Sequence, residues 1–203
     1  MTRHLPPCLL PAALALLTVA SPAPLHAQRV PAVPKLDLNQ ITGTWFEQAR
    51  LPFKWERRCV SDDTILFALN DKKHTFQRGT FCRVATGNAD SHNDTGKLDK
   101  AGDGVLKLRH LVFFSTKLNV LAAAPDFSWA VLGTPNHKNL WLLTRTAKPT
   151  PAINAEMTRQ AAAAGFNTSR LLPVTHLGTT FRAEQGTPTG QGPGQPVPDK
   201  ALP

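Results

Sequence analysis

From residue 43 to residue 145 the chain alternates between apolar and polar side chains in short runs, and each run ends at a turn signal. A period of two places neighbouring side chains on opposite faces of a β-strand. Pairs such as Pro125-Asp126 and Pro135-Asn136 are typical of the turns between strands. The pattern predicts eight strands, at 43–50, 59–69, 74–84, 93–99, 104–112, 117–124, 128–133 and 139–145.

Eight consecutive antiparallel strands of this length predict an all-β fold, as an up-and-down barrel or as a sandwich. Closing the sheet into a barrel removes its exposed edges, and an eight-stranded barrel is wide enough to hold one small ligand. In the first strand the period of two puts Trp45, Glu47 and Ala49 on one face. Gly43, at the start of this strand, allows the backbone to bend sharply where the strand enters the sheet.

One helix is predicted after the last of these strands. Thr150 can cap its first turn, Pro151 suits the first helical position, and Gly165 suits the residue after its end. The strand 139–145 is apolar on both faces, so we expect it beneath the helix, and a final short strand near 171–176 could pair with the first. The helix face that would pack on the sheet comprises Ile153, Met157, Ala161 and Ala164.

The two ends of the chain differ in composition from its middle. Residues 1–27 combine a short basic start, an apolar run and a final small residue, as a secretory signal peptide does. The run is shorter than the roughly 20 residues that span a membrane, although an uncut N-terminal anchor is the alternative. Residues 28–35 form a polar lead-in, 36–178 the folded domain, and 179–203 a Pro- and Gly-rich tail that we expect to be disordered. The tail is either a solvated spacer or a segment that binds a partner.

Two cysteines, Cys59 and Cys82, follow the predicted signal peptide. An even number of cysteines in an exported chain indicates a disulfide. If the strands 59–69 and 74–84 form a hairpin, each cysteine lies about eleven residues from the turn, so the two oppose each other. We therefore predict a Cys59–Cys82 disulfide and no metal site, because His74 alone adds too few ligands.

The formal net charge of +9 could attract nucleic acid, anionic lipids or acidic ligands. The basic residues are scattered, however, and Lys54, Arg57 and Arg58 form their only tight group in the sequence. No basic helix, zinc-ligand spacing or aromatic RNA-binding motif accompanies them, so we do not expect nucleic acid as a partner.

The sequence contains none of the common catalytic motifs. It has no nucleophile elbow, no His-Glu-x-x-His helix, no phosphate-binding loop and no nicotinamide fingerprint. The histidines after the signal peptide are dispersed, which is typical of solvated or packed side chains rather than of haem or zinc ligands. We therefore predict no catalytic residue, no cofactor and no metal, and a protein that is not an enzyme.

The order of motifs resembles that of the lipocalin family, most of all its bacterial outer-membrane members and their relatives apolipoprotein D and the plant temperature-induced lipocalins. Three stretches, spread over a domain of about residues 36–178, support the resemblance. They are Gly-Thr-Trp-Phe-Glu-Gln-Ala-Arg at 43–50, Asp-Phe-Ser-Trp-Ala-Val-Leu-Gly at 126–133 and Leu-Trp-Leu-Leu-Thr-Arg-Thr at 140–146.

The resemblance implies an eight-stranded antiparallel up-and-down β-barrel with one C-terminal helix packed on it. It also implies a structural floor at one end of the barrel, near Gly43, where Arg145 packs across Trp45. A guanidinium over an indole ring is a cation–π contact worth roughly 1–2 kcal/mol when shielded from water. Phe46 stands where these relatives usually have tyrosine. The predicted signal lacks the lipid-attachment cysteine of the membrane-bound bacterial members, so an anchor is not implied.

Ligand contacts are expected from inward-facing residues and from the loop 52–58 at the mouth of the barrel. Phe53 and Trp55 either cover an acyl chain or only cover the rim, and the basic residues of the loop, Arg57 among them, would meet a carboxylate or phosphate. Glu47 faces inward, so it either pairs internally or recognises a polar headgroup. Strand parity alone assigns the other wall positions, and a register slip of one residue would invert them. These positions are Ala49, Thr64, Leu66, Ala68, Val120, Ala122 and Ala130.

Together these features predict an exported binding protein that holds a fatty acid or a lysophospholipid-like lipid in its barrel, for transport, storage or scavenging. We expect a periplasmic or secreted protein, with peripheral association with the outer membrane as an alternative. A lipid-modifying enzyme that uses the internal carboxylate of Glu47 is the alternative function. The sequence leaves the identity of the ligand and the oligomeric state open.

Overall fold

The computed structural model describes Met1 and residues 30–70, 75–99, 104–109 and 114–178. In this part of the chain eight antiparallel strands form a closed barrel, because each strand pairs with the next and β8 pairs back with β1. The fold is therefore the barrel and not the sandwich. The strands are β1 Gly43–Arg50, β2 Cys59–Asn70, β3 Thr75–Val84, β4 Ala89–Leu98, β5 Val105–Arg109, β6 Ser115–Ala123, β7 Trp129–Gly133 and β8 Leu140–Thr144.

Most strand boundaries agree with the prediction, and β4 is the main exception. It begins at Ala89, well before the predicted start at residue 93, because its first residues are polar and show no apolar alternation. The predicted signal peptide, the middle of the turn near Asn70, the end of the predicted strand 104–112 and the tail 179–203 lie outside the described residues.

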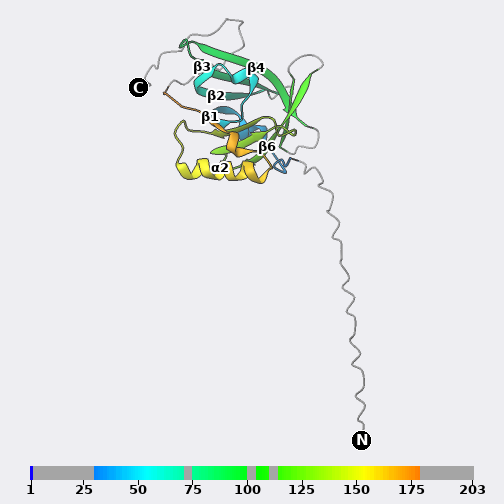
Figure 1. Ribbon diagram of the computed structural model, residues 1–203. Coiled ribbons are helices and arrows are strands. Elements are labelled where there is room, and N and C mark those ends of the chain that lie inside the picture. Colours follow the sequence, from blue (N-terminus) through cyan, green and yellow to red (C-terminus); the bar gives the residue numbers. More distant parts are fainter. Residues whose placement is uncertain (2–29, 71–74, 100–103, 110–113, 179–203) are drawn as a thin grey trace.

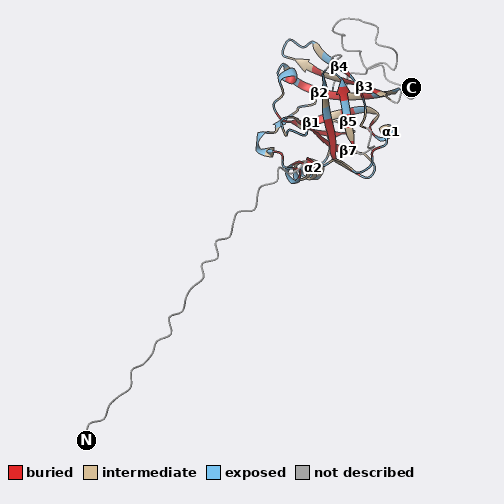
Figure 2. Cartoon of the chain, turned by 90° about the vertical axis from the view of Figure 1, so that its right-hand side faces the viewer, coloured by how far each residue is buried: buried red, intermediate tan, exposed pale blue. Residues whose placement is uncertain are grey.

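Two apolar layers share the strands of the barrel, and Figure 2 shows buried residues running along them. The inner layer fills the barrel around Trp45. The outer layer lies between the barrel wall and α2 (Pro151–Ala163), which runs along one side of the barrel in Figure 1. β8 contributes to both, with Trp141 and Leu143 in the inner layer and Leu140 and Leu142 in the outer one. Its two apolar faces thus have the predicted positions.

The helix α2 begins and ends as its sequence predicts. The side chain of Thr150 accepts a hydrogen bond from the backbone N–H of Ile153, and Pro151 occupies the first turn. Gly165 has a φ of +85°, a left-handed conformation that favours glycine after a helix. The packed face is confirmed, since the outer layer includes Met157, Ala161 and Ala164, with Ile153 partly buried against it.

A short N-terminal helix, α1 (Leu38–Ile41), lies at the floor of the barrel and is too short to leave a periodic signal in the sequence. The indole Nε1 of the fully buried Trp45 donates a hydrogen bond to the carbonyl oxygen of Ile41 at 2.7 Å. The Arg145 guanidinium lies 3.7 Å from the centre of the Trp45 ring and donates to the carbonyl oxygens of Gln40 and Thr44. A Cβ on Gly43 (φ +90°) would lie 3.4 Å from Arg145 Nη1, so the strand starts in a narrow space.

β-Bulges change which residues face inward, and they correct several predicted wall positions. In β1 the pairing with β8 shifts between Glu47 and Ala49. Arg50 is therefore buried among charged partners inside the barrel, whereas Ala49 packs in the outer layer against the helix side. The prediction that Ala49 faces the cavity is wrong for this reason.

The same kind of irregularity affects β2 and β6. In β2 the register shifts between Cys59 and Thr64, so Ile65 and Phe67 belong to the inner layer. Their neighbours Leu66 and Ala68 therefore point outward, against the prediction. In β6 a shift between Val120 and Ala122 leaves Ala122 outside, and the next residue, Ala123, packs against the inner layer.

Cys59 and Cys82 form a disulfide with a Cα–Cα distance of 5.5 Å. They are not directly opposed, because Cys59 pairs with Val84 and the β2 irregularity lies opposite Cys82. At the other end of the domain, β9 (Leu172–Pro173) pairs with the end of β1, as expected for the final short strand. None of the helices in the described part of the chain has the length and apolar character that crossing a membrane requires.

Candidate functional site

Two cavities lie at the open end of the barrel, the end where β1 stops and β2 starts. The connection between these strands, residues 51–58, contains the short helix η1 (Lys54–Glu56). The polar cavity has a volume of about 550 Å³ and the apolar cavity about 410 Å³. Both cavities are lined by Phe53, Lys54, Trp55, Arg78 and His92, so the side chains of the 51–58 loop lie where the two meet.

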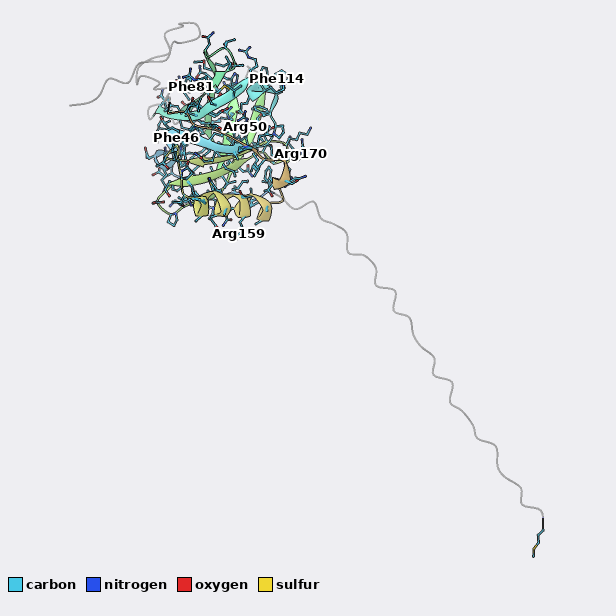
Figure 3. The ribbon with its side chains drawn as sticks, turned by 60° about the vertical axis from the view of Figure 1, so that its left-hand side comes forward. Phe46, Arg50, Phe81, Phe114, Arg159 and Arg170 are labelled. Carbon is cyan, nitrogen blue, oxygen red and sulfur yellow. A yellow bond between two sulfur atoms is a disulfide. The ribbon has the colours of Figure 1, made fainter. Side chains whose placement is uncertain are left out.

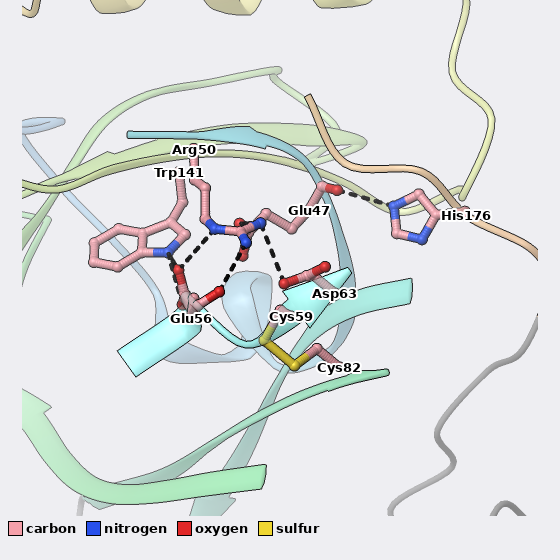
Figure 4. A network of polar contacts seen from close by, with 8 residues as sticks. All are labelled: Glu47, Arg50, Glu56, Cys59, Asp63, Cys82, Trp141 and His176. Carbon is pink, nitrogen blue, oxygen red and sulfur yellow. Dashed lines mark hydrogen bonds and ion pairs between the residues drawn. A yellow bond between two sulfur atoms is a disulfide. The ribbon is translucent and has the colours of Figure 1, made fainter. Parts of the chain in front are cut away.

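Arg50 lies at the centre of a buried ion cluster that forms part of the wall of the polar cavity (Figure 4). Its Nη1 atom is 3.2 Å from Glu47 Oε1 and 3.2 Å from Asp63 Oδ1, and its Nε atom is 3.3 Å from Glu56 Oε2. Its Nη2 also donates to the backbone oxygen of Glu56 at 3.1 Å, and Trp141 Nε1 donates to the Glu56 carboxylate at 3.2 Å. The cluster therefore ties the 51–58 loop to the barrel wall.

Three carboxyl groups around one guanidinium cannot all ionise easily in a buried site. Burial, reinforced by the charges of Glu56 and Asp63, raises the pKa of Glu47 well above 4.5. Burial also raises the pKa of Glu56, and it raises that of Asp63 to about 7. Burial alone would lower the pKa of Arg50, but the three carboxylates outweigh it and the net shift is upward. The cluster consequently pairs a permanent cation with carboxyl groups that hold their protons to higher pH than exposed carboxyl groups do.

The disulfide lies beside this cluster, as Figure 4 shows. Ligand atoms of Cys59, Asp63 and Cys82 lie within 4.8 Å of one another, a spacing that could suit a metal ion. Both sulfurs are bonded to each other, so this group has no thiolate to offer. On the other side, the carbonyl oxygen of Glu47 accepts a hydrogen bond from His176 Nε2 at 2.9 Å.

The apolar cavity has aromatic and aliphatic walls. Leu108, Phe114, Leu118 and Trp141 line it, with Thr116, Thr134 and Asn139 as polar members. The ring of Phe53 meets that of Trp141 edge-on, with their centroids 5.7 Å apart. Below this level the barrel is filled by the inner layer, so both cavities belong to its upper part.

Arg78 of β3 is a buried cation that both cavities share, and it is only 5% exposed. Its Nη2 atom pairs with Asp94, which also lies 3.3 Å from His92 Nε2. Among the described residues, no hydrogen-bond acceptor meets its buried Nε atom. The ring of His92 stacks on that of Trp55 at 5.9 Å between centroids. Arg78 thus lines both cavities and keeps one buried N–H donor without a hydrogen-bond partner among the described residues.

The predicted site residues divide into three groups. The polar cavity is lined by Glu47, Phe53, Trp55, Arg57 and Thr64, and Phe53 and Trp55 also line the apolar one. Val120 and Ala130 face the interior but lie in its packed core. Of the two interpretations of Glu47, internal pairing is the one that the Arg50 contact fits. The outward-facing residues are Ala49, Leu66, Ala68 and Ala122.

Sequence reasoning missed the two most informative residues, Arg50 and Arg78. Arg50 follows the bulge in β1, so strand parity gave it the wrong face. The sequence did contain a signal for Arg78, because it shares the even positions of β3 with the apolar residues Phe76 and Cys82. All three side chains are buried. Because Arg78 is charged, the pattern did not assign it to the inward face.

Comparison with known proteins agrees with this architecture. The model of the Lipocalin-like domain family matches residues 36–176. The chain is 28% identical over 181 residues to the outer membrane lipoprotein Blc of Escherichia coli K12, covering 85% of this chain and 98% of that protein. It is 25% identical over 145 residues to temperature-induced lipocalin-1 of Arabidopsis thaliana, covering 67% of this chain and 77% of the relative.

Solved structures support the fold. Insecticyanin from the tobacco hornworm Manduca sexta superposes with a TM-score of 0.59 at 15% identity, over 75% of this chain and 87% of that one. At this identity the likeness concerns the fold alone. The family match covers most of the described domain and agrees with the closed barrel, the helix α2 and the order of motifs. The chain is therefore a member of the lipocalin-like family.

Proposed function

We propose that the protein binds an amphiphile with one apolar chain and an anionic group, such as a fatty acid or a lysophospholipid-like lipid. The apolar cavity would take the chain, and Arg78 would bind the anionic group. The observation that supports the proposal most is Arg78 itself, a buried cation that lines both cavities and has an unpaired Nε–H. Family membership supports the coarser statement that a small hydrophobic ligand binds inside the barrel.

The energetics favour such a ligand. A buried donor without a partner costs about 1–3 kcal/mol, and a carboxylate or phosphate oxygen would satisfy it with a charge-assisted hydrogen bond. Each methylene removed from water adds about 0.8 kcal/mol of affinity. Lys54, which also lines both cavities, adds a second positive charge near the head of the ligand.

The alternative function, a lipid-modifying enzyme at Glu47, has less support. One Glu47 carboxylate oxygen is paired with Arg50, and the side chain is 2% exposed. A carboxyl group held by an ion pair is better suited to fixing the wall than to moving a proton to a ligand. We therefore assign Glu47 to the structure of the cavity and propose that the protein is not an enzyme.

We also propose that the chain is exported and acts in transport, storage or scavenging of its ligand. The N-terminal sequence of the signal-peptide type supports export. Several relatives bear the name outer membrane lipoprotein, which agrees with a place in the cell envelope.

Native mass spectrometry of the purified mature protein, before and after delipidation, tests the proposal. We expect one bound lipid per chain and renewed uptake of a long-chain fatty acid. Arg78→Lys keeps a charge opposite Asp94 but loses the Nε donor, so it should weaken fatty-acid binding by about tenfold. A fatty alcohol of the same length should bind the variant as it binds the wild type.

The matched control is Arg159→Lys, on the exposed side of α2 and paired with Glu156. Absence of any lipid uptake by the delipidated protein would refute the proposed function. An unchanged ratio of acid to alcohol affinity in Arg78→Lys would refute the role of Arg78.

A further inference from the structure

We infer that the open end of the barrel is a docking face for a bilayer that contains anionic lipids. The docking face consists of the aromatic side chains Trp55 and Phe114 and the basic side chains Lys54, Arg57 and Arg58. These residues surround the entrance of the ligand cavities, so docking would place that entrance against the lipid.

The two aromatic residues are unusually exposed for their size. Trp55 is 60% exposed and Phe114 is 66% exposed, and both line the apolar cavity. Figure 3 shows Phe114 near one edge of the molecule and Arg159, on α2, near the opposite edge. Large apolar side chains exposed together mark interaction sites, and tryptophan favours the boundary between lipid and water. The aromatic pair therefore points to an apolar partner at the entrance.

The charge around the aromatic pair is mainly positive. In the described open-end connections, at 51–58, 85–88, 114 and 134–139, the only acidic residue is Glu56, which is buried in the ion cluster. A partly exposed carboxylate of the polar cavity, Asp90 at the start of β4, pairs with Arg58 at 3.1 Å. Lys54 and Arg57 are exposed, so the face presents net positive charge toward its partner.

An anionic bilayer fits this combination better than a second copy of the chain. Basic side chains around exposed apolar ones are typical of proteins that bind anionic membrane surfaces. At a two-fold interface the same positive charges would face each other and oppose association. Entry of an amphiphile from the bilayer into the apolar cavity rests on the proposed function, whereas docking itself does not.

Co-sedimentation of the mature full-length protein with vesicles tests the inference. We expect binding to vesicles of equal parts phosphatidylcholine and phosphatidylglycerol, loss of binding in high salt, and little binding to phosphatidylcholine alone. Lys54→Gln with Arg57→Gln should weaken binding on the order of tenfold. Trp55→Ser with Phe114→Ser should have an effect at least as large. The matched charge control is Lys35→Gln with Lys148→Gln, two exposed lysines on the floor side of the barrel.

Fluorescence gives the orientation. Acyl chains that carry bromine quench nearby tryptophans, and of the other three indoles Trp45 and Trp141 are buried and Trp129 is half-buried under α2. We expect quenching in the wild type and its loss in Trp55→Phe, which keeps an aromatic ring and the fold. Near-ultraviolet circular dichroism checks that each variant is folded.

Three results would overturn the inference: no binding to anionic vesicles, equal loss of binding in the floor-side control, or full quenching in Trp55→Phe. A dimer in solution that Trp55→Ser with Phe114→Ser dissociates, without any vesicle binding, would assign the face to a second copy. Protein that takes up fatty acid but binds no vesicle refutes docking alone. Protein that binds vesicles but takes up no lipid refutes the proposed function alone.

Discussion

Two arginines stabilise the two ends of the barrel, and their surroundings are opposite in chemistry. Arg145 at the floor lies over the ring of Trp45 and donates to backbone carbonyl oxygens, and no described carboxylate forms an ion pair with it. Arg50 at the open end meets three carboxyl groups inside the wall. Burial lowers the pKa of Arg145, whereas the carboxylates raise that of Arg50.

The difference shows how one barrel can be closed at one end and adaptable at the other. The floor uses a cation with apolar and neutral partners, so its stability depends little on pH. At the open end several charged side chains lie together in the wall, so polar groups line the cavity beside them. The following changes test this contrast, from the largest expected effect to the smallest.

Arg50→Met should be the most damaging of these substitutions. It removes the cation that pairs with three buried carboxyl groups, and breaking such a set costs about 3–5 kcal/mol. Urea unfolding, with the disulfide intact, measures the loss in the free energy of unfolding. Arg159→Met on the exposed side of α2 is the control and should change stability by no more than about 0.5 kcal/mol. A smaller loss in Arg50→Met than in Arg145→Met would contradict the contrast.

Arg145→Met should cost less, about 2 kcal/mol. The substitution removes the cation–π contact and the hydrogen bonds to the carbonyls of Gln40 and Thr44, but water can reach these carbonyls because the arginine is only half-buried. Near-ultraviolet circular dichroism should show a change around Trp45 in the folded variant, alongside the urea midpoint. An effect on ligand affinity as large as that of Arg78→Lys would mean that the floor is not separate from the site.

Counted for one group and one pH unit, the pH dependence of stability should be the smallest effect, at most about 1.4 kcal/mol. Burial raises the pKa of Asp63 from 3.8 to about 7, so the folded protein keeps a proton that the unfolded chain has already released. The free energy of unfolding should therefore fall as pH rises from about 4 to about 7. The raised pKa values of Glu47 and Glu56 act in the same direction. The lowered pKa values of Asp126 and Glu156 act the opposite way, at lower pH.

Asp63→Asn tests this assignment. The variant should have a shallower decrease of the urea midpoint between these pH values than the wild type. Equal slopes in the two proteins would show that Asp63 does not titrate in this range.

The fold could be predicted from the sequence because its signals are local. The turn pairs mark the strand ends, and the two apolar faces of β8 give its place under the helix without any knowledge of its neighbours. The caps of α2 at Thr150 and Gly165 give both of its ends. These features depend on residues close together in the sequence, where a period of two or of 3.6 is unambiguous.

The site could be predicted only in part, because bulges depend on contacts between strands. The shift after Glu47 exists only in the pairing with β8, and nothing in β1 itself marks it. The loop residues Phe53 and Trp55 line the cavities as expected, since a loop position needs no register. Arg78 was missed because a charged residue within a strand suggests an outward side chain, and its partner Asp94 lies on another strand.

The bulge in β1 reverses the alternation of inward and outward side chains along the strand. Up to Glu47, odd-numbered residues face inward, and after it the even-numbered Arg50 does. Removing Gln48 would give a regular ladder, because Ala49 and Arg50 would keep their partners Leu142 and Trp141, and Arg50 would still face inward. Inserting one residue between Ala49 and Arg50 would instead turn Arg50 outward and leave three acids in the wall without a cation. Such an insertion would therefore change the interior charge of the barrel, although no interior residue had been substituted. In this protein the length of a strand determines the chemistry of its cavity as much as its composition does.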